Sequence, residues 1–100
     1  MARFDVYKYS PDVPFLVDIQ ADLLSGLKTR AVIPLLPQAQ AKHEVLPRLK
    51  PIIKINGKNY VLITTDIGTI RTADLGSSVE NVKDQRQAIV DAIDFLLQGF

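Results

Sequence analysis

The sequence offers few side chains that could carry out acid–base or nucleophilic chemistry. Its one histidine, His43, stands next to Glu44, and adjacent side chains do not usually converge on one point, so a solvated histidine is expected. The segment 64–69, TTDIGT, gathers hydroxyl groups around Asp66. No base is in evidence to activate them, and such a segment is typical of a turn. We therefore expect no catalytic residue.

The remaining charged residues favour structural roles. Asp18 and Asp22 could form a carboxylate pair, but Asp18 falls in an expected strand and Asp22 in a loop, so hydrogen bonds that shape the loop are the favoured interpretation. Arg30, Arg71 and Arg86 could bind an anion, but each is expected to be a solvated surface cation. One histidine without any cysteine cannot supply a zinc site, and the five glycines are too scattered for a phosphate loop. Neither a metal nor a cofactor is expected.

Composition narrows the class of protein. The 100 residues are 47% hydrophobic and 23% charged, with a net charge of +1, which indicates one globular domain over residues 1–100. A dense basic face is missing, so direct nucleic-acid binding is not expected. The first residues lack the apolar core of a signal peptide, and no apolar run approaches the roughly 18 to 20 residues that span a bilayer. We expect a cytoplasmic protein with some apolar surface left for a partner, and a homodimer is the first expectation.

Local patterns predict a strand-rich chain with one helix. Period-two and β-branched segments predict strands over residues 3–9, 15–20, 30–37, 51–55, 60–65 and 67–75. Asn56-Gly57 predicts a tight hairpin turn, while Pro34 and Pro37 predict that residues 30–37 form an edge strand or leave the sheet sharply. Residues 38–50 read as weakly helical or irregular. From about residue 83 to 98 the period changes to 3.6, which predicts a helix that Gly99 ends. The apolar stripe of this helix is expected to contain Ile89, Ala92, Ile93, Leu96 and Leu97.

These elements predict an α+β protein that is mainly β. Five or so short antiparallel strands form a small barrel or sheet, and one C-terminal α-helix caps it.

A longer segment adds a family resemblance. Residues 15–35, FLVDIQADLLSGLKTRAVIPL, resemble the CcdB family of bacterial toxins, which carry a similar VDVQSD segment, two aliphatic residues, a loop, an arginine and VIPL. The likeness continues in KPIIKI (50–55), TTDI (64–67) and AIDFLLQGF (92–100). It covers essentially the whole chain and is weakest over residues 36–49 and 68–84.

The resemblance implies a fold and an activity. The fold is a small SH3-like antiparallel β-barrel with an extra small sheet and one C-terminal helix, assembled as a homodimer. The activity is that of a non-catalytic toxin of a type II toxin–antitoxin module, borne on a plasmid or a chromosome. Such a toxin binds the A subunit of DNA gyrase, called gyrase A below, and traps gyrase on cleaved DNA. A CcdA-like antitoxin wraps the dimer and releases gyrase, and here it is expected along residues 10–14 and 38–50.

The resemblance also implies a set of gyrase-binding residues. The family ends its helix in Trp-Gly-Ile, and this chain has Gln98, Gly99 and Phe100 there, so the stacking aromatic is replaced at Gln98. Leu23 and Leu24 match the aliphatic pair of the loop. Near the start of the helix the family has an acidic residue and Asn, where this chain has Arg86 and Gln87. The implied contacts are Leu23, Leu24, Gln87, Gln98, Gly99 and Phe100.

Two alternatives stay open. The Gln98 departure fits a relative that still binds an antitoxin but has lost or altered its action on gyrase. The MazF and Kid ribonuclease toxins share the barrel, but they need an acid–base pair, an arginine and a basic groove. Leu23 and Leu24 could also simply pack beneath their own loop.

Overall fold

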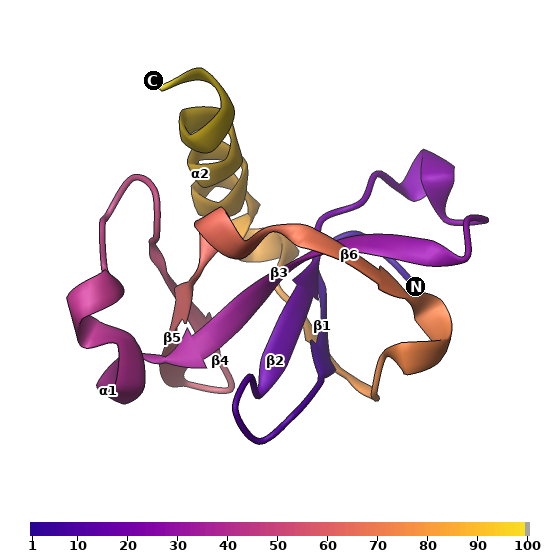
Figure 1. The fold of residues 1–100 in the computed structure, drawn as a ribbon, viewed down its shortest axis with the longest axis horizontal. Coiled ribbons are helices and arrows are strands. Elements are labelled where there is room, and N and C mark those ends of the chain that lie inside the picture. The colour runs from indigo at the N-terminus through magenta and orange to yellow at the C-terminus, as the bar shows by residue number, and fades with distance from the viewer. Residues whose placement is uncertain (100) are drawn as a thin grey trace.

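The computed structural model describes residues 1–99 and shows one antiparallel sheet with a helix standing on it (Figure 1). The seven strands are β1 (Asp5–Lys8), β2 (Phe15–Asp18), β3 (Thr29–Pro37), β4 (Ile52–Ile55), β5 (Lys58–Leu62), β6 (Gly68–Arg71) and β7 (Ser78–Asn81). The structure also contains two α-helices, α1 (Gln38–Ala41) and α2 (Arg86–Gln98). Five short 3-10 turns complete the elements: η1 (Asp22–Leu24), η2 (Lys42–Glu44), η3 (Thr64–Asp66), η4 (Thr72–Asp74) and η5 (Lys83–Gln85).

The sheet is curled into a half-barrel around β3. Its strand order is β4-β5-β3-β2-β1-β7, and β6 also pairs with β3. The sheet thus branches at β3, with β5 and β4 on one branch and β6 on the other. Every pairing is antiparallel. The expected class, α+β and mainly β with a C-terminal helix, is confirmed.

Of the two outcomes that the prolines predict, the edge position is wrong, while the chain does leave the sheet directly after Pro37, where α1 begins. β3 is the most central strand: it pairs with β2 on one side, and on the other with β6 through residues 29–32 and with β5 through residues 35–37. Pro34 falls where the partner changes, so its missing N–H is not needed there. Its carbonyl still accepts a hydrogen bond from the Ile63 amide at 3.0 Å.

Two hairpins are present, and the one predicted at Asn56-Gly57 is among them. β1 and β2 pair from Val6 opposite Val17 to Lys8 opposite Phe15. β4 and β5 are joined at Asn56 and Gly57, whose φ angles are 51° and 79°. Two consecutive positive φ values are what a tight two-residue hairpin turn requires, and Asn and Gly adopt them at low cost.

The region after β5 departs from the predicted pattern. The strand expected over 67–75 ends at Arg71 and gives way to the turn η4. β7, which the sequence patterns do not predict, then pairs with β1 across an irregularity between Val6 and Tyr7. Its residues, SVEN, are too polar and too few to show a period. Gly76 lets the chain reach β1, since a Cβ there would stand 2.5 Å from the Lys8 carbonyl oxygen.

The helix α2 closes the core as its periodicity predicts. Ile89 and Ala92 are fully buried, in one apolar cluster with residues of the sheet such as Val17, Ile33 and Ile55. Each large aliphatic side chain in this position contributes roughly 1.5–3 kcal/mol to stability. Leu97 departs from the predicted stripe because it is 73% exposed.

Within residues 1–99, none of the helices has the length and apolar character needed to cross a membrane.

Candidate partner-binding surface

The one histidine lies on an exposed turn beside Glu44. The His43 side chain is 77% exposed, and its Nε2 lies 4.0 Å from Glu44. Glu44 accepts a hydrogen bond of 2.6 Å from Lys50, and this bond holds the pKa of the Glu44 carboxyl below its usual range. Across residues 1–99, no three metal-ligating side chains come close enough together to hold an ion.

Arg30 corrects a sequence-based expectation. The sequence predicts a surface cation, but the Arg30 side chain is fully buried and its Nε donates a 2.7 Å hydrogen bond to Asp18, which is also fully buried. This bond is the main reason that the pKa of Arg30 is raised against the opposing effect of burial. Its two terminal nitrogens are buried without an acceptor among the described residues. Arg71 and Arg86, in contrast, are exposed as expected.

Asp18 shapes the loop that follows it, as the sequence suggests. Its Oδ1 accepts a 3.0 Å hydrogen bond from the amide of Gln20, while Oδ2 is taken by Arg30. Because Asp18 ends β2 and Arg30 stands near the start of β3, the pair fastens together the two strands from which the loop rises.

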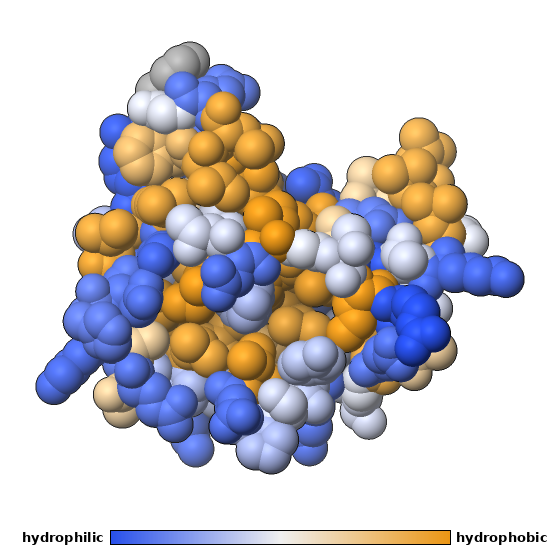
Figure 2. Space-filling model, in the orientation of Figure 1, coloured by the Kyte–Doolittle hydropathy of each residue, from blue (hydrophilic) through white to orange (hydrophobic). Residues whose placement is uncertain are grey.

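The loop carries an exposed apolar tip. Every residue from Ala21 to Thr29 is exposed, and Leu23, Leu24 and Leu27 are exposed to 94%, 47% and 52%. Figure 2 shows an apolar projection in the place where Figure 1 draws this loop. Leu23 therefore does not pack beneath its own loop. Leu27 is not among the residues predicted from the sequence, although it is a third leucine in a segment of nine residues.

The other expected contact residues lie along α2. Gln87 and Gln98 are eleven residues apart, which corresponds to three helical turns, so they share one face of α2 about 16 Å apart. Asp91 and Asp94 lie between them on the same face, and Gln87 donates a 2.8 Å hydrogen bond to Asp91. This face is exposed along its length.

Gly99 ends the helix as predicted. Its φ is 80°, in the left-handed region, and its amide donates a 2.8 Å hydrogen bond to the Phe95 carbonyl. Glycine adopts this conformation without the penalty of a side chain. Phe100, the last expected contact, lies outside the described residues.

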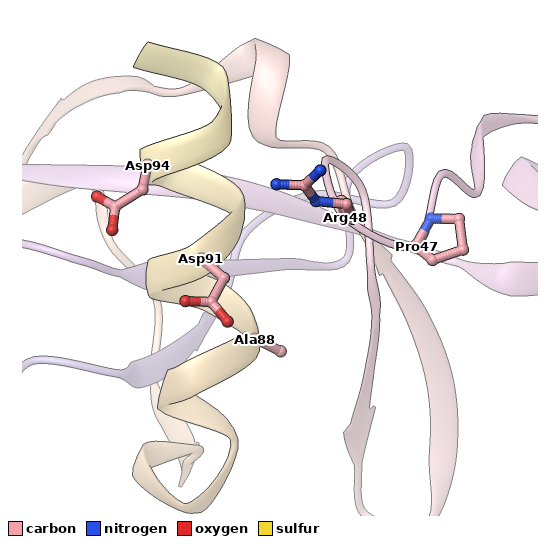
Figure 3. Close-up of a pocket in the computed structure, with 5 residues that line it drawn as sticks. All are labelled: Pro47, Arg48, Ala88, Asp91 and Asp94. Atoms are coloured by element: carbon pink, nitrogen blue, oxygen red, sulfur yellow. The ribbon is translucent and has the colours of Figure 1, made fainter. Parts of the chain in front are cut away.

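A hollow of about 390 Å³ borders the same helix face (Figure 3). Asp91 and Asp94 lie on its α2 side, and Pro47 and Arg48 on the side of the 46–50 loop. The Arg48 guanidinium stands 4.3 Å from the centre of the Phe95 ring, a distance suited to a cation–π contact. Arg48 lies in the 38–50 segment expected to meet an antitoxin, but its contact with the helix is not predicted, because nothing local marks it as facing the helix.

In one chain the expected contact residues fall on two separate projections. The end of α2 and the loop of residues 21–28 rise from the same side of the molecule, apart from each other (Figure 1). Leu23 and Leu24 are on one projection, and Gln98 and Gly99 are at the tip of the other. Gln87 is at the base of α2.

The turn expected to meet an antitoxin is also an open surface. Residues 10–14 border a hollow of about 330 Å³ whose lining is mostly apolar and includes Pro11, Pro14 and Phe15. Tyr9, at its rim, is 51% exposed. In the second expected segment, 38–50, Leu46 is 51% exposed.

Comparison with known proteins identifies a family and shows a similar fold in solved structures. The family model described as "CcdB protein" matches residues 3–99. A solved structure described as "Endoribonuclease in complex with its cognate antitoxin from Mycobacterial species" is similar with a TM-score of 0.72. That match covers 97% of this chain and 92% of the other at 14% sequence identity, so it supports a shared fold.

Proposed function

Since this chain belongs to the CcdB protein family, we propose that it is the toxin of a type II toxin–antitoxin module and acts by binding gyrase A. It is a single toxin domain that works as a homodimer and traps gyrase on cleaved DNA. A CcdA-like antitoxin neutralises it.

The observation that carries this proposal is the exposed leucine tip of the 21–29 loop. Leu23 is 94% exposed, although burying one leucine side chain contributes roughly 1.5–3 kcal/mol. Leu24 and Leu27 add to the same apolar tip. Apolar side chains gathered in this way mark an interaction site more often than a solvated surface. The exposed helix face with Gln87 and Gln98 supplies polar contacts on the second, separate projection.

The setting of the charged side chains favours binding rather than RNA cleavage. Arg30, the arginine of the 15–35 segment, is fully buried against Asp18 and cannot reach a substrate. His43 stands on an exposed turn. Net charge is only +1, which is a weak field for attracting RNA. The endoribonuclease likeness, at 14% identity, concerns the fold.

Gln98 favours one second candidate, an antitoxin-binding relative that no longer poisons gyrase. Gln98 is exposed at the helix end, where the family has its stacking tryptophan. An aromatic anchor lost from the centre of an interface costs about 2 kcal/mol or more, close to a thirtyfold loss of affinity. Leu23 and Leu24 would then have to supply most of the binding.

Expression in paired bacterial strains tests the proposal. The strains carry either a sensitive gyrase A or a resistant one, and growth and cleaved chromosomal DNA are followed after induction. Growth arrest with cleaved DNA only in the sensitive strain is expected. Equal arrest with degraded RNA would favour a ribonuclease, and no arrest together with tight antitoxin binding would favour the second candidate.

A further inference from the structure

The loop that carries the leucine tip has little packing to hold it. All residues from 21 to 29 are exposed, and the backbone hydrogen bonds inside η1 are local. The Leu24 amide donates to the Ala21 carbonyl, the Ser25 amide to Asp22, and the Leu27 amide to Leu24. Such short turns are easily opened, because they bury no apolar surface.

Two side chains join this loop to the body of the protein. The Gln20 Nε2 donates a 2.8 Å hydrogen bond to the Leu24 carbonyl, and the Gln20 Oε1 accepts a 3.0 Å bond from the Ala31 amide on β3. Asp22 Oδ1 accepts a 2.8 Å hydrogen bond from the backbone amide of Arg3, in the segment before β1. Among residues 1–99, these two contacts, Gln20 to Leu24 and Arg3 to Asp22, are the hydrogen bonds that join residues 21–27 to the rest of the protein.

The two tethers are themselves anchored. Gln20 is only 9% exposed, and its backbone amide donates a hydrogen bond to the buried Asp18. Arg3 donates from its Nε to the Ile19 carbonyl at 3.1 Å, and its guanidinium lies 4.8 Å from the centre of the Phe4 ring. Both ties therefore start from groups that are fixed by other contacts, which is what holding an exposed segment in one position requires.

We propose that Gln20 and Asp22 are positioning residues that hold the leucine tip in its binding conformation before the partner arrives. This inference rests on the proposed function for the identity of the partner. An apolar tip that is already ordered loses less conformational entropy on binding, so the tethers raise affinity without touching the partner. Neither residue needs to contact gyrase.

Four single variants of the full-length protein test this role. Gln20→Glu keeps the acceptor for Ala31 but loses the donor to Leu24, and Asp22→Ala loses the acceptor for Arg3. Asp22→Asn keeps an acceptor oxygen and serves as the conservative rescue. Ser25→Ala is the matched control, since the Ser25 hydroxyl makes no hydrogen bond to another described residue.

Amide hydrogen exchange measures directly how well the two tethers hold the loop. The amides of Leu24, Ser25 and Leu27 are expected to exchange at least tenfold faster in Gln20→Glu and Asp22→Ala. They should be unchanged in Asp22→Asn and Ser25→Ala, and the strand amides of Val17 and Ile33 should be unchanged in all four. Loop exchange that stays at the wild-type rate in both tether variants overturns the proposal.

The affinity for purified gyrase A measures whether loss of a tether weakens partner binding. Gln20→Glu and Asp22→Ala are each expected to bind gyrase A at least fivefold more weakly than wild type. In a Leu23→Ser background, the same two substitutions should cause little further loss of affinity. A general loss of structure would not depend on Leu23. Faster exchange with unchanged affinity refutes the positioning role. If wild-type protein does not bind gyrase A, the proposed function fails, and the exchange rates alone decide whether Gln20 and Asp22 hold the loop.

Discussion

Replacing Arg30 by methionine should strongly destabilise the protein. The side chains of Arg30 and Asp18 are both fully buried and are joined by a hydrogen bond of 2.7 Å. Arg30→Met removes the cation and leaves the Asp18 carboxylate buried with the Gln20 amide as its remaining donor. Removing one partner of a buried ion pair costs about 3–5 kcal/mol, a large part of the roughly 5–15 kcal/mol that stabilises a typical domain.

The double variant should recover most of this loss. Asp18→Asn together with Arg30→Met removes both charges and keeps an acceptor for the Gln20 amide. The terminal nitrogens of Arg30, which are buried without an acceptor among residues 1–99, disappear as well. Each buried unsatisfied group costs about 1–3 kcal/mol, so the double variant should lie within about 1–2 kcal/mol of wild type.

Urea denaturation of the wild type, both single variants and the double variant measures these free energies of unfolding. The expected coupling energy between the two sites is about 3 kcal/mol or more. A cost below about 1 kcal/mol for Arg30→Met, or a double variant whose cost equals the sum of the single ones, would refute the assignment of a buried ion pair.

Three further predictions concern the surface and the pH dependence. Leu23→Ser should weaken gyrase A binding by about 2 kcal/mol and leave the free energy of unfolding within about 0.5 kcal/mol of wild type, because Leu23 is 94% exposed. Calorimetry measures the binding and urea denaturation measures the stability. A loss of stability would mean that Leu23 packs against the body of the protein. Gln98→Trp should tighten gyrase A binding at least tenfold by restoring the aromatic at the exposed helix end, and unchanged affinity would show that this position is not used. Burial, followed by the charges of Asp5 and Asp18, raises the pKa of Tyr7 from 10.0 to about 12. The neutral Tyr7 side chain therefore contributes its full stabilisation below pH 10, and about 2–3 kcal/mol of this stabilisation is lost as the pH rises to about 12. Denaturation from pH 9 to 12 should show this decline in the wild type and a flatter profile in Tyr7→Phe; parallel profiles would contradict it.

Strong local signals in the sequence predict the elements that they govern. Asn56-Gly57 fixes its hairpin through two positive φ values, and Gly99 ends α2 in the left-handed region. The helical period places Ile89 and Ala92 in the core. In each case the determining interaction lies within a few residues of the chain, so that pattern and structure agree.

Other features depend on contacts between distant segments. Arg30 is buried because Asp18, twelve residues away, lies beside it on the neighbouring strand, and no local pattern distinguishes it from a surface arginine. Pro34 tolerates the centre of the sheet because β3 changes partner there. β7 exists through its pairing with β1, more than 70 residues earlier in the chain.

The expected contact residues follow from the family resemblance rather than from any local pattern. The loop leucines and the helix face are exposed, as the proposed contacts require, but Phe100 lies outside the described residues. A loop-shaping hydrogen bond at Asp22 is expected from the sequence, but its partner, the Arg3 amide, is not. The tether from Gln20 could not be predicted, since a glutamine gives no sign of which backbone group it meets.

Purified gyrase and supercoiled DNA provide the most direct measurement of how this protein acts. The protein is incubated with both in the presence of ATP, the reaction is stopped with detergent and protease, and linear DNA is quantified. The account predicts linear DNA that increases with protein concentration and falls sharply in Leu23→Ser. Supercoiled DNA that stays uncleaved at every concentration, from a protein that is folded and dimeric, would contradict it.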